Sequence, residues 1–113
     1  MAEYLVDTDI LVDHLRRARR FEPGGDRVSY SVITRCELFA ARSAEEDVIG
    51  ALLGTMSEID VGRAIAERGG RLRRETGIPT PDAVIAATAL EHALPIFTRN
   101  TRHFRRVPEL ELF

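Results

Sequence analysis

Three acidic residues occupy positions where neither local propensity nor packing calls for an acid. Asp7 directly follows a short apolar run, residues 4–6, which has the length of a buried strand. Glu37 and Asp82 each share a predicted helix face with small and apolar residues three and four positions away. A carboxylate on a core-facing stripe is costly unless it is paired or binds a metal ion. These three residues are therefore the first candidates for a functional site.

Each acid also has a purely structural explanation. Asp7 can be a turn or helix-cap residue, and Glu37 can be an exposed helix residue. Asp82 falls in a first helical turn, where the helix dipole favours acids. Asp7 and Asp82 are both expected at the same edge of a parallel sheet, however, and ligand crevices lie at that edge. Three hard oxygen ligands without a histidine or cysteine partner suit Mg²⁺ or Mn²⁺ rather than zinc.

Strand and helix patterns alternate along the chain. We expect strands at residues 3–6, 28–30, 56–59, 94–98 and, at an edge, 110–113. We expect helices at residues 10–20, 32–42, 44–54, 61–75 and 81–92, a loop at 21–26, and a loop or helical turn at 99–104. The expected helix caps are Thr8 or Asp9, Ser31, Ser43 and Thr80, and Gly69-Gly70 should weaken its helix. Such alternation predicts an α/β fold with a parallel sheet covered on both faces.

Composition sets the limits of the interpretation. The 113 residues are enough for one domain, residues 1–113, and the 44% hydrophobic and 30% charged residues are ordinary for a soluble globular protein. No apolar run approaches the roughly 18 residues of a membrane span, and Glu3 and Asp7 interrupt what would be a signal peptide. Cys36 is the only cysteine, so an internal disulfide is impossible. We expect a cytoplasmic protein with no membrane association.

Four segments, in this order, resemble the motifs of PIN-domain ribonucleases and, more narrowly, of the VapC-type toxins of prokaryotic toxin–antitoxin pairs. They are residues 5–9, 31–38, 81–90 and 98–104. Each motif alone is weak, but four in the right order over nearly the whole chain are a strong signal. The resemblance implies a single PIN-like, three-layer α/β/α domain with a central parallel sheet and an acidic, Mg²⁺-dependent site.

Matching by motif assigns the three core carboxylates of that family to Asp7, Glu37 and Asp82. The resemblance implies that they hold Mg²⁺, for which Mn²⁺ can substitute. It also implies hydrolysis of RNA by a metal-activated water, which leaves a 5′-phosphate and a 3′-hydroxyl.

The residues around these ligands are assigned supporting roles. Thr8, Asp9 and Thr98 are expected to orient the ligands, with Asp9 also a helix cap. The family usually has an acid within residues 98–104, whereas this chain offers Asn100 and His103 there. Asn100 can donate an oxygen to a metal or hold a water, so we count it with the catalytic residues. One fewer charge should weaken binding of a second metal ion.

The resemblance also implies partners, namely an RNA substrate, a second copy in a homodimer, and a cognate VapB-like antitoxin that blocks the site. Residues 32–54 carry enough apolar side chains for an interface, although core packing would explain them equally well. The candidate contacts to the RNA backbone are Arg16, Arg17, Arg99 and Arg102.

Other functional classes remain to be weighed. The chain contains no lysine, which argues against haloacid-dehalogenase phosphatases and response-regulator receiver domains, since both need one. A more serious alternative is a degenerate PIN domain that binds RNA or a protein partner without catalysis. The missing fourth acid favours that alternative, and an RNase assay with and without Mg²⁺ would separate the two.

Overall fold

A central sheet of four parallel strands organises the chain. The computed structural model describes residues 1–113 and orders the strands β3-β2-β1-β4. Their bounds are β1 (Glu3–Val6), β2 (Arg27–Ser31), β3 (Ser57–Ile59) and β4 (Ile96–Phe97). The predicted α/β class with a parallel sheet is confirmed. The strand order reverses between β1 and β4, and ligands of open α/β sheets bind at the carboxyl ends of strands beside such a reversal.

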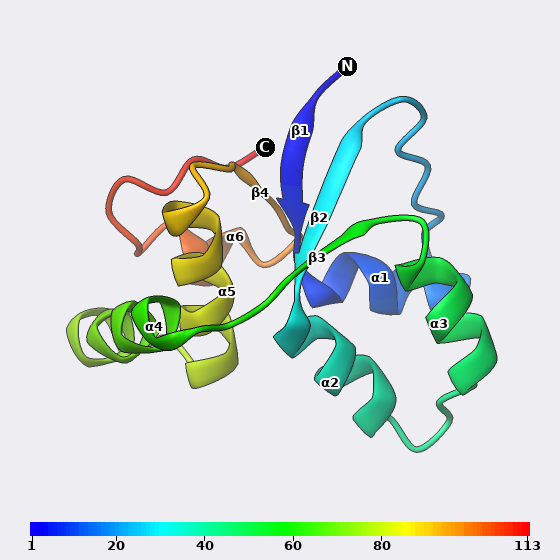
Figure 1. Ribbon diagram of the computed structural model, residues 1–113, viewed down its shortest axis with the longest axis horizontal. Coiled ribbons are helices and arrows are strands. Elements are labelled where there is room, and N and C mark those ends of the chain that lie inside the picture. The colour runs from blue at the N-terminus through cyan, green and yellow to red at the C-terminus, as the bar shows by residue number, and fades with distance from the viewer.

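Helices cover both faces of the sheet (Figure 1). The six helices are α1 (Thr8–Leu15), α2 (Val32–Ala40), α3 (Glu46–Leu53), α4 (Arg63–Thr76), α5 (Thr80–Glu91) and α6 (Thr101–Phe104). In Figure 1, α4, α5 and α6 lie on one side of the sheet and α1 and α3 on the other, with α2 below the strand ends. None of these helices is both long enough and apolar enough to cross a membrane.

Alternation along β1 divides the apolar residues into two cores. Tyr4 and Val6 join the core beneath α1, α2 and α3, whereas Leu5 joins the core beneath α4, α5 and α6. Successive side chains of a strand point to opposite faces of the sheet, so this central strand is buried on both sides. Its burial fixes the position of the acid that follows it.

Helix α1 departs from the sequence prediction at both ends. Asp7, and not Thr8 or Asp9, is its N-cap, because the Asp7 side chain accepts a hydrogen bond from the backbone N–H of Thr8. The helix ends at Leu15 instead of residue 20, and Arg17 has a φ of 59°. A left-handed residue cannot continue an α-helix, so the arginines after Leu15 lie outside it.

Of the other predicted helix and strand boundaries, some are confirmed and some are wrong. Ser31 caps α2 as expected, with its hydroxyl accepting from the N–H of Ile33. Ser43 does not cap α3, which begins at Glu46 without a side-chain cap bond, and α5 already includes Thr80. The predicted strand at residues 94–98 shortens to β4. The expected edge strand at residues 110–113 reduces to one parallel bridge between Ile96 and Leu112.

The two adjacent glycines of α4 play different roles. A Cβ on Gly69 would lie 3.1 Å from Val84 Cγ2 and 3.2 Å from Val84 Cα, whereas a Cβ on Gly70 would meet nothing within 4 Å. Gly69 therefore lets α4 approach the backbone of α5 closely. The expectation that both glycines weaken the helix stays a prediction, and only Gly69 also has a packing role.

Alanine substitutions at these two positions should act in opposite directions. Gly70→Ala should stabilise the protein by about 0.5–1 kcal/mol, because alanine restricts the unfolded chain and suits an exposed helix position. Gly69→Ala should destabilise it by about 1–3 kcal/mol, because the new methyl group overpacks the α4–α5 contact. Urea unfolding of the two variants beside the parent protein measures both free energies. A stabilised Gly69→Ala would contradict this account of the contact.

Candidate active site

Asp7 is held at the carboxyl end of β1 by the neighbouring strand. Val6 pairs with Phe97 in parallel register, so the next residues, Asp7 and Thr98, leave the sheet side by side. The Thr98 hydroxyl donates to Asp7 Oδ2 at 2.7 Å, and the Thr8 N–H donates to Asp7 Oδ1 at 2.8 Å. Asp7 is only 4% exposed. Both of its oxygens are therefore oriented by residues that the sequence had assigned to supporting roles.

Asp9 ties the first turn of α1 to the segment after β4. Its Oδ2 accepts from the N–H groups of Arg99 and Asn100, both at 3.1 Å, and from the Thr98 hydroxyl at 3.3 Å. Its Oδ1 is fully buried and has no hydrogen-bond partner. Buried polar atoms are nearly always satisfied, so this oxygen is free to accept from a water or to bind a cation.

Glu37 reaches the site through Thr8. The Thr8 hydroxyl lies 2.7 Å from Glu37 Oε1 and 2.9 Å from the hydroxyl of the fully buried Thr34. Thr8 has one hydroxyl proton and donates it to the carboxylate, so Thr34 must donate to Thr8. Thr34 was missed from the sequence, although it lies three residues before Glu37 on the same face of α2.

Asp82 is joined to the segment after β4 by His103. His103 Nδ1 lies 2.6 Å from Asp82 Oδ2 and 2.8 Å from Asn100 Nδ2. A ring nitrogen cannot both donate to a carboxylate and accept from an amide. The shorter contact, which is the one to the carboxylate, assigns the Nδ1 proton to Asp82. The sequence left open whether Asn100 or His103 replaces the missing acid, and the structure links both to Asp82.

Charge repulsion and burial raise the pKa of Asp7 from its ordinary value of 3.8 to about 7. Burial is the largest cause, and the nearby Asp9 carboxylate is the next. The hydrogen bonds from Thr98 and Thr8 lower the pKa, while the charge of Asp82 raises it further. Asp9 and Asp82 therefore both lie close enough to Asp7 to repel its charge, and a cation beside Asp7 would favour its ionised form.

The donor set fits a hard divalent cation. Every candidate ligand offers carboxylate oxygen, which suits Mg²⁺ or Mn²⁺, and the buried Asp9 Oδ1 has no hydrogen-bond partner. No three histidine, cysteine or acidic side chains surround a common point as metal ligands would. Instead, hydrogen bonds from Thr8, Thr98 and His103 hold the carboxylates.

The four arginines predicted to contact RNA fall into two groups. Arg99 is engaged, since its Nε lies 2.6 Å from Asp13 Oδ2. Arg16, Arg17 and Arg102 are exposed. The partner of Arg99 was missed from the sequence, although Asp13 lies one helical turn after Asp9.

A groove lies between α1, α2 and α3 and includes one of the exposed arginines. Glu37 and Arg16 both line it. Its remaining surface is mostly apolar and includes Val12, Leu38 and Val48. Glu37 therefore borders both the carboxylate cluster and an apolar surface.

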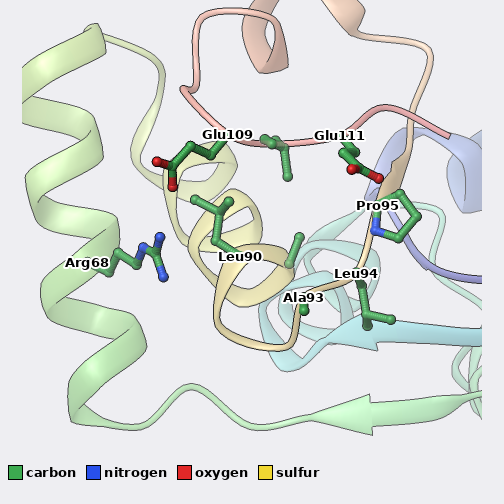
Figure 2. A pocket seen from close by; sticks show the side chains of 9 residues that line it. Arg68, Leu90, Ala93, Leu94, Pro95, Glu109 and Glu111 are labelled. Carbon is green, nitrogen blue, oxygen red and sulfur yellow. The ribbon is translucent and has the colours of Figure 1, made fainter.

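A second hollow, of about 290 Å³, lies away from these residues (Figure 2). Arg68, Glu109 and Glu111 border it over an apolar floor that includes Leu90 and Pro95. Pro95 precedes β4, whereas Thr98 follows it, so this hollow opens near the opposite end of that strand. It contains none of the predicted site residues.

Comparison with known proteins gives one consistent family. The PIN domain family matches residues 4–110. Ribonuclease VapC19 of Mycobacterium tuberculosis is 35% identical, over 95% of this chain and 96% of its own length. Ribonuclease VapC1 of Methanocaldococcus jannaschii is 28% identical, over 98% of this chain and 85% of its own length.

Solved structures agree with this result. A toxin–antitoxin complex from Klebsiella pneumoniae contains a chain that is 35% identical, with a TM-score of 0.78 over 95% of this chain and 94% of that one. VapBC2 from Rickettsia felis, bound to a promoter DNA fragment, gives a TM-score of 0.79 at 21% identity over 100% and 98% of the two chains, and supports the fold alone. This chain belongs to the PIN domain family and, within it, to the VapC ribonucleases.

Proposed function

We propose that this chain is a metal-dependent endoribonuclease toxin that cleaves RNA and is neutralised by a VapB-like antitoxin. One observation carries the proposal: the Asp7 carboxylate, whose pKa is raised by burial and then by two nearby acids, lies at the strand reversal of a VapC fold. Perturbed carboxylates at such a position are typical of functional sites. The cytoplasmic location expected from the sequence is part of the same proposal.

Asp7, Glu37 and Asp82 are proposed to hold the divalent cation. When bound, Mg²⁺ supplies a water of lowered pKa and stabilises charge on the attacked phosphate, and Mn²⁺ can replace it. Thr98 and Thr8 orient Asp7 for this role.

The remaining residues position the ligands and the RNA. Thr8 holds Glu37 by the same hydroxyl that contacts Thr34, and His103 holds Asp82. The exposed Arg16, Arg17 and Arg102 are proposed to bind RNA phosphates. In the net reaction a water oxygen bonds to phosphorus and the P–O3′ bond breaks, which leaves a 3′-hydroxyl and a 5′-phosphate.

The proposed partners are an antitoxin and a second copy of the chain. The 35% identical structure from Klebsiella pneumoniae is a toxin–antitoxin complex, and the groove beside Glu37 offers an apolar surface next to the site. Of the apolar residues considered for an interface, Ile49 and Leu53 belong to the core, whereas Phe39 and Val48 are 36% and 49% exposed. Phe39 and Val48 are therefore the better candidates for contact with another chain.

The alternative is a non-catalytic RNA- or protein-binding module. One observation favours it, namely that Asn100 stands in the segment where the family usually has an acid. The intact cluster around Asp7 argues the other way, because burial of charged groups costs stability that binding alone would not require. An RNase assay separates the two functions.

Replacement of Asp7 tests the catalytic assignment. The parent protein should cleave a labelled RNA in Mg²⁺ but not in EDTA, and Asp7→Asn should reduce cleavage by about 100-fold or more, because it removes a charged ligand. Asp60→Asn, at an exposed loop position, is the matched control and should cleave like the parent. Retained Mg²⁺-dependent cleavage by Asp7→Asn would refute the assignment.

The same substitution should stabilise the metal-free protein at alkaline pH. Because the pKa of Asp7 is about 7 in the folded state and 3.8 ordinarily, the folded protein binds the extra proton between these values. The free energy of unfolding should therefore fall as pH rises from about 4 to 7 and stay low above that. Asp7→Asn should melt higher than the parent at pH 8 in EDTA, and the difference should vanish near pH 4. A lower melting temperature at pH 8 would contradict this.

Growth assays test the toxin assignment in cells. Induced expression of the parent protein should arrest growth, whereas Asp82→Ala should relieve the arrest, because it removes a proposed ligand. Immunoblots must show equal amounts of the two proteins. Continued arrest by Asp82→Ala at equal abundance would count against a nuclease origin of the toxicity.

A further inference from the structure

We propose that Asp9 is a ligand of the divalent cation and supplies the acid that residues 98–104 lack. This inference rests on the proposed function, since it assigns a further ligand to the same site. From the sequence, Asp9 was expected only to cap a helix and to support the ligands. Its contacts in the structure indicate a direct role in binding the cation.

The first argument is location. Asp9 Oδ2 lies 3.1 Å from the backbone nitrogens of both Arg99 and Asn100. The Asp9 carboxylate thus rests against the segment from which the missing acid would project. Asp9, which belongs to α1, therefore lies beside the segment after β4, where the family usually has its fourth acid.

The second argument is the unsatisfied oxygen. All three donors around Asp9 bind Oδ2, and Oδ1 is buried without a partner. A buried carboxylate oxygen without a donor is costly. A bound cation would satisfy Oδ1 and leave the three bonds to Oδ2 intact.

The third argument is proximity to Asp7. One hydroxyl, that of Thr98, lies 2.7 Å from Asp7 Oδ2 and 3.3 Å from Asp9 Oδ2. A hydroxyl has one proton, so the two carboxylates share a single donor. Two acids so close together favour a cation that both can bind.

The Asn100 side chain does not itself replace the acid that residues 98–104 lack. Its side-chain amide contacts His103 at 2.8 Å, and His103 in turn contacts Asp82. The amide is therefore committed to orienting the Asp82 side of the site. The backbone N–H of Asn100, by contrast, holds Asp9.

Asp9→Asn removes the negative charge of the side chain but keeps its hydrogen bonds. The amide oxygen of asparagine can accept from Thr98, Arg99 and Asn100 as Oδ2 does, so the link between α1 and the segment after β4 is preserved. Only the anionic oxygen at the Oδ1 position is lost. Asn100→Asp is the converse change, since it restores an acid where the family usually has one.

Calorimetric titration with Mn²⁺ tests the proposal on the parent protein, Asp9→Asn, Asn100→Asp and the double variant. Asp9→Asn should weaken Mn²⁺ binding about tenfold or more without lowering the melting temperature in EDTA. Asn100→Asp alone should not weaken Mn²⁺ binding, because it adds a carboxylate in the segment where the family usually has one. In the double variant, Asn100→Asp should restore most of the Mn²⁺ affinity that Asp9→Asn loses. The effects of the two substitutions on the binding free energy would then not add.

Asp7→Asn distinguishes failure of this inference from failure of the proposed function. If Asp7→Asn abolishes Mn²⁺ binding but Asp9→Asn does not weaken it, only the role of Asp9 is overturned. If neither substitution affects binding, the proposed metal site itself is wrong. Should Asp9→Asn fail to fold, Asp9→Ser carries the same expectation, and unchanged Mn²⁺ affinity in that variant overturns the inference.

Discussion

The parallel pairing of β1 with β4 is the constraint on which the site depends. It joins residues 91 positions apart in the hydrogen bond from Thr98 to Asp7, and it does so at the one place where the strand order reverses. Burial of β1 between two cores leaves Asp7 no freedom to turn toward solvent. The helices that follow β1 and β4 then bring Asp9 and His103 to the same edge.

The clustering of these carboxylates costs folding stability, while it provides the ligands that a cation needs. Each of Asp7, Glu37 and Asp82 accepts a hydrogen bond from a neighbouring side chain, and none forms an ion pair with an arginine. Arginine therefore does not offset the negative charge of these carboxylates. A site of this kind is ready for an external cation, whether a metal ion or a guanidinium offered by another protein.

Much of the architecture followed from local pattern. Apolar runs predicted β1 and the α/β class, and turn residues placed most helix ends within a few positions. Asp7, Glu37 and Asp82 could be singled out because an acid on an apolar stripe is unusual. The contacts of Asp9, His103 and Thr34 could not be predicted, since they depend on how α1, α2 and α6 meet in space. The end of α1 was missed because nothing in the sequence before Arg17 marks a left-handed residue.

The close contact of Gly69 with Val84 extends the demands of the site beyond its own residues. Val84 lies two positions after Asp82 at the start of α5, so the depth at which α4 seats against α5 also sets where that carboxylate stands. Position 69 is thereby constrained by the placement of a side chain on another helix. A substitution at position 69 can thus displace the Asp82 carboxylate without contacting it.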